Sequence, residues 1–537
     1  MEKLIDRSGF ETIVENIMPT RVVLHGGVEK VEELLVEKPA GISFRTDICA
    51  RFTGKGSYVV LDFGKELCGS IRLLTNNIDK MGANFRITLG ESVSEACSEL
   101  GGKKNATNDH SPRDFVAYAS LLGDVPYGLS GFRFARIELL EDRPALMQNI
   151  FAQSRLPHFA QEAHFTSSDE LLNKIFDTAA YTIKLNYQNG YIWDGIKRDR
   201  LVWAGDLHQE TVAGVYLFGK NVNAPNSFDF LRDCTPEGTW MNYIPNYSAW
   251  WVVNLCDYCR MTNDEALFAR HKDYAQYVMA KLNACIAEDG SIDFGQQGDM
   301  AFFLDWPTCG TPDAKPGTVA LLCFTAQTLL AVTEDLSSRE ILRKLSPRLN
   351  EETARKQTRA FQILAGREDE EDLAFLEKDG AHGFSTFMAY YILKAMAKKG
   401  GDKMLPMIKE YFGGMLSRGA TSFWEDFDLN WLKNSSRIDE LPKEGELDLH
   451  GDFGAFCYIG LRHSFCHGWS GGVTAFIIEH MIGLELLDGY KRIRVTPHAL
   501  GVEYLHIDLP TPYGTLVIDV DNGKAEVTAP EGIAVEA

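Results

Sequence analysis

Residues 194–206 (DGIKRDRLVWAGD) contain the densest group of chemically capable side chains in this sequence of 537 residues. They hold three acids, three basic residues and Trp203, between an aromatic stretch and the start of a predicted helix. Gly195 and Gly205 indicate an irregular loop, and loops held by a rigid scaffold often carry functional groups. Carboxyl groups gathered in this way can transfer protons. Composition alone also allows an exposed loop of paired charges.

A second candidate segment, residues 420–427 (ATSFWEDF), places Glu425 directly after Phe423 and Trp424. If these apolar neighbours bury the carboxyl group, they raise its pKa, because a low dielectric disfavours the charged form. The alternative is a Glu425 side chain that points into water while the two rings pack. The residue types leave both interpretations open.

The third candidate segment, residues 463–472 (HSFCHGWSGG), contains Ser464 close to His463 and His467. A serine near histidines can indicate a nucleophile, but the G-x-S-x-G turn of many serine hydrolases is absent. The histidine spacing also lacks the helical glutamate of a zincin metal site. The pattern favours a hydrogen-bonding histidine in a polar pocket, and we expect neither a metal nor a cofactor.

Tryptophans in or beside predicted loops form a fourth group: Trp240, Trp250 and Trp251 in one region, and Trp306 directly after Asp305 in another. Flat apolar rings suit the stacking of sugar rings, and a carboxylate can bind sugar hydroxyls. The group is therefore typical of a sugar pocket, although packing in the core explains each tryptophan equally well.

The chain around these segments divides into three predicted regions. Residues 1–165 show short runs in which apolar and polar residues alternate between Gly and Asn turns, which predicts a β-sandwich. Within this region, residues 57–63 predict a strand that ends at Gly64, and residues 98–114 predict an exposed loop or hairpin. Residues 488–537 return to short strand patterns and predict a small C-terminal β-sandwich.

Residues 166–487 predict a large helical domain, because apolar residues recur at helical spacing through most of it. Successive helices joined by loops of unequal length fit an (α/α)6 barrel, and the absence of a fixed-period repeat argues against a solenoid. Three helix starts carry a capping-box pattern, in which Glu follows three residues after Ser or Thr: Ser167, Thr262 and Ser337.

Composition and charge exclude several classes of partner. The net charge of −21 repels nucleic-acid phosphates and anionic lipids, and no apolar run reaches the length of about 18 residues that a membrane span needs. The N-terminal residues do not form a signal-peptide pattern. Eleven cysteines with a single C-x-x-C, at Cys256 and Cys259, predict buried thiols in a reducing cytoplasm. The oligomeric state is not fixed by the sequence, and a homodimer is one option.

Four ordered motifs together resemble the α-L-rhamnosidase family. DGIKRDRLVWAGD is similar to the family's D-x-P-x-R-(D/E)-R-L-G-W-T-G-D, and TSFWEDFD is similar to T-T-x-W-E-x-x-D. SFCHGWSGG is similar to S-x-x-H-x-W-x-x-G, and YIPNYSAWW resembles the barrel segment that follows the first motif. The resemblance implies a β-sandwich, an (α/α)6 barrel and a C-terminal β-sandwich. It also implies hydrolysis of terminal α-L-rhamnosides with inversion, without a cofactor.

The resemblance assigns roles to individual residues. Asp199 falls at the general-acid position and Glu425 at the general-base position. The resemblance implies that the sugar is bound by Asp194, Arg198, Trp203, Asp206 and His467. The predicted sugar pocket adds Trp250, Asp305 and Trp306.

Two departures from the family pattern leave alternatives open. Asp199 stands where the family often has Glu, and Val202 and Ala204 replace the common Gly and Thr. The pocket is then narrower, or the substrate differs from a plain rhamnoside. Asp206 or Glu210 are the alternative acids. The alternative functions are another (α/α)6 carbohydrate enzyme, either a hydrolase or a lyase, and an inactive carbohydrate-binding protein.

Overall fold

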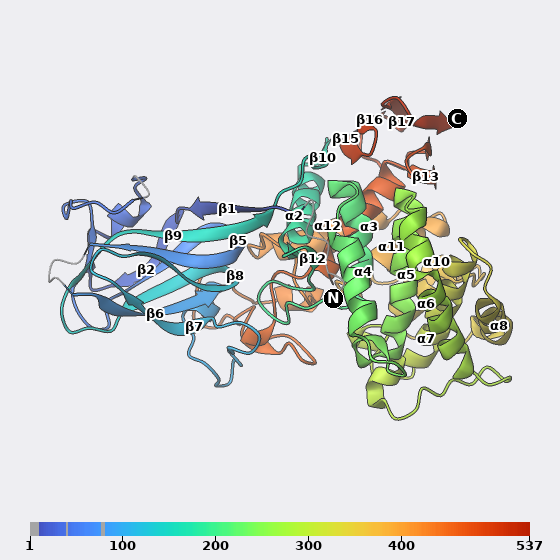
Figure 1. Cartoon of the computed structure of the whole chain (residues 1–537), viewed down its shortest axis with the longest axis horizontal. Coiled ribbons are helices and arrows are strands. Elements are labelled where there is room, and N and C mark those ends of the chain that lie inside the picture. Colours follow the sequence, from blue (N-terminus) through green and yellow to red (C-terminus); the bar gives the residue numbers. More distant parts are fainter. Residues whose placement is uncertain (1–9, 39–40, 77–80, 537) are drawn as a thin grey trace.

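The computed structural model describes residues 10–38, 41–76 and 81–536. A β-sandwich forms one end of the molecule, and a large helical domain forms the other (Figure 1). The C-terminal strands form small sheets at one edge of the helical domain. This arrangement confirms the predicted fold class.

The N-terminal sandwich has the strand order β3-β4-β9-β5-β8-β6-β7, with β1 paired to β9 and β2 paired to β5. Alternate side chains of the long strands point inward and pack in one apolar core, as the two-residue period of a strand requires. The strands are β1 (Thr12–Ile17), β2 (Arg21–Gly26), β3 (Val28–Glu29), β4 (Ala50–Phe52), β5 (Tyr58–Thr75), β6 (Ala83–Gly90), β7 (Asp114–Ala119), β8 (Asp124–Leu139) and β9 (Ala145–Pro157).

Strand β5 corrects the prediction that a strand ends at Gly64. The strand continues to Thr75, and its register against β8 shifts between Asp62 and Leu67. Gly64 has φ +85°, a left-handed conformation that glycine adopts without a steric penalty. The glycine therefore marks an irregularity inside one long strand, where a β-bulge bends the chain without ending it.

The helical domain is organised around a closed ring. Helices α3, α5, α7, α9, α11 and α13 contact one another in this order, and α13 contacts α3 again. Helices α6, α8, α10 and α12 pack against members of this ring. The helices are α2 (Glu170–Asn186), α3 (Leu207–Phe218), α4 (Asn223–Cys234), α5 (Pro245–Thr262), α6 (Glu265–Ala284), α7 (Ala314–Leu330), α8 (Leu336–Leu345), α9 (Lys356–Leu364), α10 (Asp372–Glu377), α11 (Ala389–Lys398), α12 (Met404–Ser417) and α13 (Val473–Phe476).

The predicted helix starts lie near the observed ones, but the capping residues differ. In each case an aspartate carboxylate accepts a backbone N–H of the first turn, so the Ser and Thr assignments are wrong. Aspartate caps as well as serine does, and its negative charge also favours the positive end of the helix dipole. The capping residues are Asp169 for α2, Asp264 for α6 and Asp335 for α8.

The C-terminal sheets include chain from outside the predicted C-terminal region. Strand β10 (His164–Ser167) pairs with β15 (Tyr504–Thr511), which continues to β16 (Gly514–Asp521) and β17 (Lys524–Thr528). A second sheet joins β13 (Leu484–Asp488), β14 (Arg492–Val495) and β18 (Ala534–Glu536). Strand β10 thus lies across the boundary predicted at residue 165, and β13 ends at the one predicted at 488. Among the helices of the described residues, none combines the length and apolar character needed to cross a bilayer.

Candidate active site

Backbone hydrogen bonds join the three sequence motifs at one place in the fold. Gly468 N donates to Asp194 O at 2.8 Å, and residue 195 forms a β-bridge with His467. His467 N donates to Phe423 O at 3.0 Å, and Glu425 N donates to Ser464 O at the same distance. Segments more than 200 residues apart are therefore held side by side, as the motif interpretation requires.

His467 lies at the centre of a group of buried carboxyl groups. Its Nε2 atom lies 3.8 Å from Asp194 Oδ2, 3.6 Å from Asp206 Oδ1 and 3.9 Å from Glu425 Oε1. Burial, and to a smaller extent the charge of Arg198, lowers the pKa of His467 well below its usual value. The ring is therefore neutral near pH 7 and can both donate and accept a hydrogen bond.

Arg198 connects the two residues that the motifs assign to proton transfer. Its Nη2 donates to Glu425 Oε1, and its Nη1 lies 3.6 Å from Asp199 Oδ1. Burial raises the pKa of Glu425, while Arg198 opposes this shift and the charge of Asp199 adds to it. Ser464 N donates to the other oxygen of Glu425 at 3.2 Å. The two carboxyl groups thus meet different nitrogens of one guanidinium.

The backbone at Asp199 and Arg200 is left-handed, with φ values of +56° and +59°. Residues other than glycine adopt this conformation uncommonly, and such residues are enriched at functional sites. The Asp199 side chain is 17% exposed, whereas the Asp194 and Glu425 side chains are each 3% exposed. Asp199 is therefore the most accessible of these three carboxyl groups.

Asp194 and Asp206 lie deeper and favour the protonated form. Burial raises the pKa of Asp194 well above its usual value, and the charges of Asp199 and Asp206 add to the shift. Burial raises the pKa of Asp206 to about 8, although Tyr247 donates a hydrogen bond to it at 3.0 Å. Near pH 7 Asp206 is largely neutral and can act as a hydrogen-bond donor.

Glu210, one of the two alternative acids, is excluded by its position. It is fully buried in α3, below the loop, and a side chain on Gly468 would collide with its carboxyl group. Within the described residues, neither of its carboxylate oxygens has a hydrogen-bond partner. Burial raises its pKa well above the usual value and favours the neutral form, and the side chain, which is 0% exposed, is closed off from a substrate. Asp206 remains the alternative acid.

Aromatic side chains adjoin the carboxyl groups, and two of them were not expected. Trp306 stacks on Phe456 with 5.2 Å between ring centroids, and Tyr458 lies edge-on to Trp306. The Arg198 guanidinium lies 5.8 Å from the centre of the Tyr458 ring. Trp203 packs edge-on against Tyr247, the hydrogen-bond donor to Asp206. Phe456 and Tyr458 belong to no recognisable motif, so they could not be identified from the sequence alone.

The remaining predicted pocket residues have different outcomes. Asp305 is buried beside Trp306, whose backbone N–H it accepts at 2.8 Å, and burial raises its pKa to about 7. Trp250 is 0% exposed and packs against Phe361 and Tyr391 in the core of the ring. Its assignment to sugar binding is wrong, because its position in α5 turns the ring into the core.

Lys197 anchors the loop of residues 194–206 to the N-terminal sandwich, and it was not among the predicted site residues. Its ammonium lies 3.0 Å from Glu91 and 3.1 Å from Glu95, both from the N-terminal sandwich. It also donates to the carbonyl oxygens of Leu461 and His463 at 3.1 and 2.6 Å. The two glutamates could hold a metal with a nearby histidine, but the ammonium already lies between their carboxylates. The sequence around Glu91 resembles an ordinary short helix start, so it did not indicate an ion pair with Lys197.

Replacing Lys197 by methionine is expected to destabilise the protein by about 3–5 kcal/mol, because two buried glutamates lose their partner. Chemical unfolding followed by tryptophan fluorescence measures this change. The matched control is Lys103→Met, since Lys103 is exposed in a nearby loop. A Lys197→Met protein as stable as the control would show that the buried network contributes no net stability.

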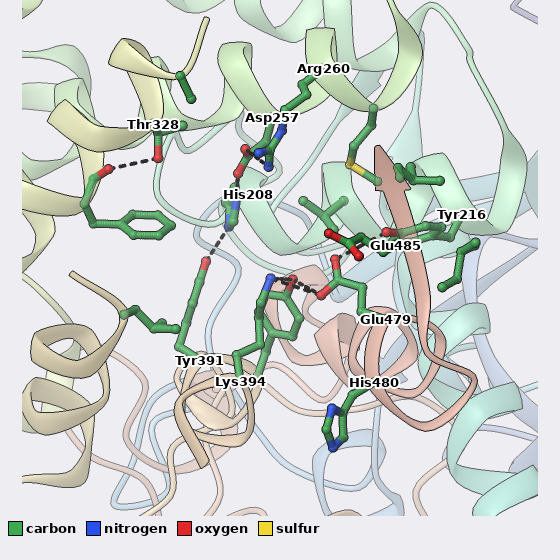
Figure 2. A pocket seen from close by; sticks show the side chains of 18 of the residues that line it. His208, Tyr216, Asp257, Arg260, Thr328, Tyr391, Lys394, Glu479, His480 and Glu485 are labelled. Atoms are coloured by element: carbon green, nitrogen blue, oxygen red, sulfur yellow. Dashed lines mark hydrogen bonds and ion pairs between the residues drawn. The ribbon is translucent and has the colours of Figure 1, made fainter. Parts of the chain in front are cut away.

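A separate cavity of about 660 Å³ lies along the ring helices, toward the ends of α5 and α7 and beside β13 (Figure 2). Its polar groups pair with one another: His208 bonds Tyr391 and Asp257, and Lys394 bonds Glu479. None of the predicted site residues lines it. The candidate active site instead lies before the starts of α3 and α7 and at the start of α5, on the side that faces the sandwich.

Comparison with known proteins finds a family model that matches part of the helical domain. Residues 160–306 match the family model described as the bacterial alpha-L-rhamnosidase 6 hairpin glycosidase domain. The match covers the first part of the helical domain, from α2 to the segment before α7. The matched segment contains the first sequence motif, residues 194–206, and agrees with the resemblance found in the sequence. No curated protein sequence gives a significant match to the chain.

Solved structures share the fold across nearly the whole chain. The GH78 family rhamnosidase of Bacillus sp. GL1 superimposes with a TM-score of 0.71 and 18% identity, over 94% of this chain and 55% of that protein. A Klebsiella oxytoca rhamnosidase with rhamnose bound gives 0.68 and 18%, over 87% and 96%. A Streptomyces avermitilis α-L-rhamnosidase complexed with L-rhamnose gives 0.68 and 13%, over 98% and 50%. The chain thus spans about half the length of the Bacillus and Streptomyces proteins.

Proposed function

We propose that this protein hydrolyses terminal α-L-rhamnosides with inversion, with Asp199 as general acid and Glu425 as general base. The observation that carries the proposal is Arg198, which contacts both carboxyl groups through different guanidinium nitrogens. An inverting hydrolase needs its two carboxyl groups roughly 6.5–9.5 Å apart, with room for one water. Because each carboxyl group meets its own nitrogen of the guanidinium, Asp199 and Glu425 face one site from two separate segments of the chain.

In the proposed mechanism, Asp199 protonates the leaving oxygen as the glycosidic bond breaks. Glu425 takes a proton from the water that attacks the anomeric carbon from the opposite face. The contact with Arg198 and the hydrogen bond from Ser464 N favour the ionised form of Glu425 and oppose the effect of its burial on the pKa. The greater exposure of Asp199 suits a group that must reach the departing aglycone.

The remaining groups are proposed to hold the sugar. Neutral His467 and protonated Asp206 can donate hydrogen bonds to hydroxyl groups, and Asp194 adds a third buried polar group. Trp306 offers a flat face beside them. The partner is thus a carbohydrate, and the chemistry needs no cofactor. The eleven unpaired cysteines support a cytoplasmic location as a further part of the proposal.

A panel of aryl glycosides tests the substrate class. We expect turnover of aryl α-L-rhamnosides and no comparable turnover of the gluco, manno and fuco analogues. A lyase of uronates would need free arginines in the pocket, whereas Arg198 is already engaged by two carboxyl groups. Preferential turnover of a different glycoside would replace rhamnose in the proposal, and binding of rhamnose without turnover of any glycoside would favour an inactive binding protein.

A further inference from the structure

We propose that Phe456 is a specificity-determining residue, whose exposed ring binds a leaving group that carries an aromatic ring. The inference rests on the proposed function, because it concerns the other half of the substrate of the same site. It adds a residue that lies outside the four sequence motifs, on the loop of residues 453–460.

The leaving group must lie on the outer side of Asp199, as the exposure of the carboxyl groups indicates. A general acid has to contact the leaving oxygen, and the Asp199 side chain is 17% exposed. The side chains of Asp194 and Glu425, assigned to the sugar and to the attacking water, are each 3% exposed. The sugar therefore lies inside, and the leaving group lies toward the surface.

The loop of residues 453–460 reaches this outer side through Arg198. The Nη1 atom of Arg198 lies 3.6 Å from Asp199 Oδ1, and it donates to Cys457 Sγ at 3.8 Å. One guanidinium nitrogen thus joins the proposed acid to the residue that follows Phe456. Because consecutive Cα atoms are only about 3.8 Å apart, Phe456 lies at the mouth of the site.

The Phe456 ring is supported on one side and exposed on the other. It stacks on Trp306 with 5.2 Å between the ring centroids and 25° between the ring planes, so one face is covered. Phe456 is nevertheless 44% exposed, which leaves the rest of the ring open to a ligand. Aromatic rings bind one another by stacking or edge-on contact, with a gain beyond the area that they bury.

The loop maintains Phe456 in an unfavourable state. Its φ of +57° is left-handed, which is an outlier for a bulky residue, and its exposure forgoes the free energy of burying a large apolar ring. Gly460 N donates to Phe453 O at 2.8 Å and closes the loop at its base. Residues held in strained conformations are enriched at ligand-binding sites, so the strain supports a function for this ring.

The N-terminal sandwich also holds the loop and helps to shape this surface. Asn105 Nδ2 donates to Ile459 O at 3.0 Å. Asn105 belongs to residues 98–113, which connect α1 (Val93–Ala96) to β7 and were predicted only as an exposed excursion. Ile459 is 52% exposed and adds a second apolar side chain on the same loop. Neither Phe456 nor Ile459 offers a side-chain hydrogen bond, so the pair suits an aromatic ring better than a second sugar.

The test compares benzyl and methyl α-L-rhamnoside, because their leaving groups are alcohols of similar acidity and only one of them carries a ring. We expect the wild type to prefer the benzyl compound in kcat/KM, and Phe456→Ala to reduce this preference by about 10-fold. Hydrolysis of the methyl compound should change by less than about 2-fold, because the sugar and the acid are untouched.

Two further variants separate binding of the ring from a general structural effect. Phe456→Tyr keeps an aromatic face and should keep the preference. Phe44→Ala removes a phenylalanine that is 85% exposed in the N-terminal sandwich, and it should change neither substrate. A benzyl preference that survives in Phe456→Ala would overturn the proposal.

Binding measured without turnover separates this inference from the proposed function. Calorimetry with benzyl and methyl 1-thio-α-L-rhamnoside, which resist hydrolysis, should show the same preference and the same loss in Phe456→Ala. That result would support the leaving-group site even if no rhamnoside were turned over, in which case only the proposed function would fail. Equal binding of the two compounds by the wild type, or binding of neither, would overturn the inference.

Discussion

Replacing Glu425 by glutamine is expected to lower kcat on an α-L-rhamnoside by about 10²–10⁴-fold, the usual contribution of a positioned general base. The amide cannot accept the proton of the attacking water. It keeps the shape of the side chain and one acceptor oxygen for Arg198 or for Ser464 N, so the protein should still fold. Steady-state kinetics and a thermal unfolding curve measure the two effects separately.

The matched control is Glu479→Gln. Glu479 also binds a cation and a hydroxyl group, through Lys394 and Tyr390, but it lies at the separate cavity. Its replacement should leave kcat unchanged. If Glu425→Gln retained activity within a few-fold of the wild type, Glu425 would not be the base.

The raised pKa of Glu425 also sets the direction of the pH dependence. Because the base acts when ionised, activity is present above its pKa and is lost as the pH falls through it. Burial raises this pKa, so the acid limb of the wild-type profile should lie above the usual titration range of a glutamate, which is centred near pH 4.3. The limb should be absent from the residual activity of Glu425→Gln.

Replacing Asp199 by asparagine is expected to lower kcat/KM far more for substrates with poor leaving groups than for activated substrates. The task of the acid is to protonate the departing oxygen, and its loss typically costs about 10²–10⁴-fold when that proton is needed. A dinitrophenyl oxide leaves without help, so its rhamnoside should be hydrolysed at nearly the wild-type rate. Comparison of kcat/KM for the two substrates measures the difference.

Asp206→Asn is the companion variant, because Asp206 is the alternative acid with a pKa of about 8. If Asp199 is the acid, Asp206→Asn should lower kcat/KM for both substrates by the same factor, because it weakens sugar binding. If the leaving-group dependence instead followed Asp206, the acid role would move to Asp206 and Asp199 would become a sugar ligand.

The central part of the site was predictable from the sequence because its chemistry is concentrated in short segments. Asp194, Asp199 and Asp206 share one loop, and Glu425 and His467 lie in runs of unusual composition. The backbone bonds between these runs then place their side chains together. The order of strands and helices was predictable because the spacing of apolar residues that distinguishes a helix from a strand is a local property of the chain.

The supporting groups could not be predicted, because they depend on how two domains meet. Lys197 gains its role only when Glu91 and Glu95 approach from the sandwich. His110 lies in a polar loop that has no motif of its own, and its ring nitrogen accepts the backbone N–H of Asp199, which is 89 residues further along the chain. Trp250 shows the opposite error, because a tryptophan near a predicted loop can equally belong to the core, and here it does.

The stereochemistry of the first product tests the central claim most directly. The proposal has water attack the anomeric carbon once, with Glu425 holding that water and forming no bond to the sugar. Proton NMR of the early reaction on an aryl α-L-rhamnoside should therefore show β-L-rhamnose first, with the α-anomer appearing only as mutarotation proceeds. An initial α-anomer would contradict the account, because it requires a covalent intermediate and carboxyl groups near the roughly 5–5.5 Å spacing of a retaining pair.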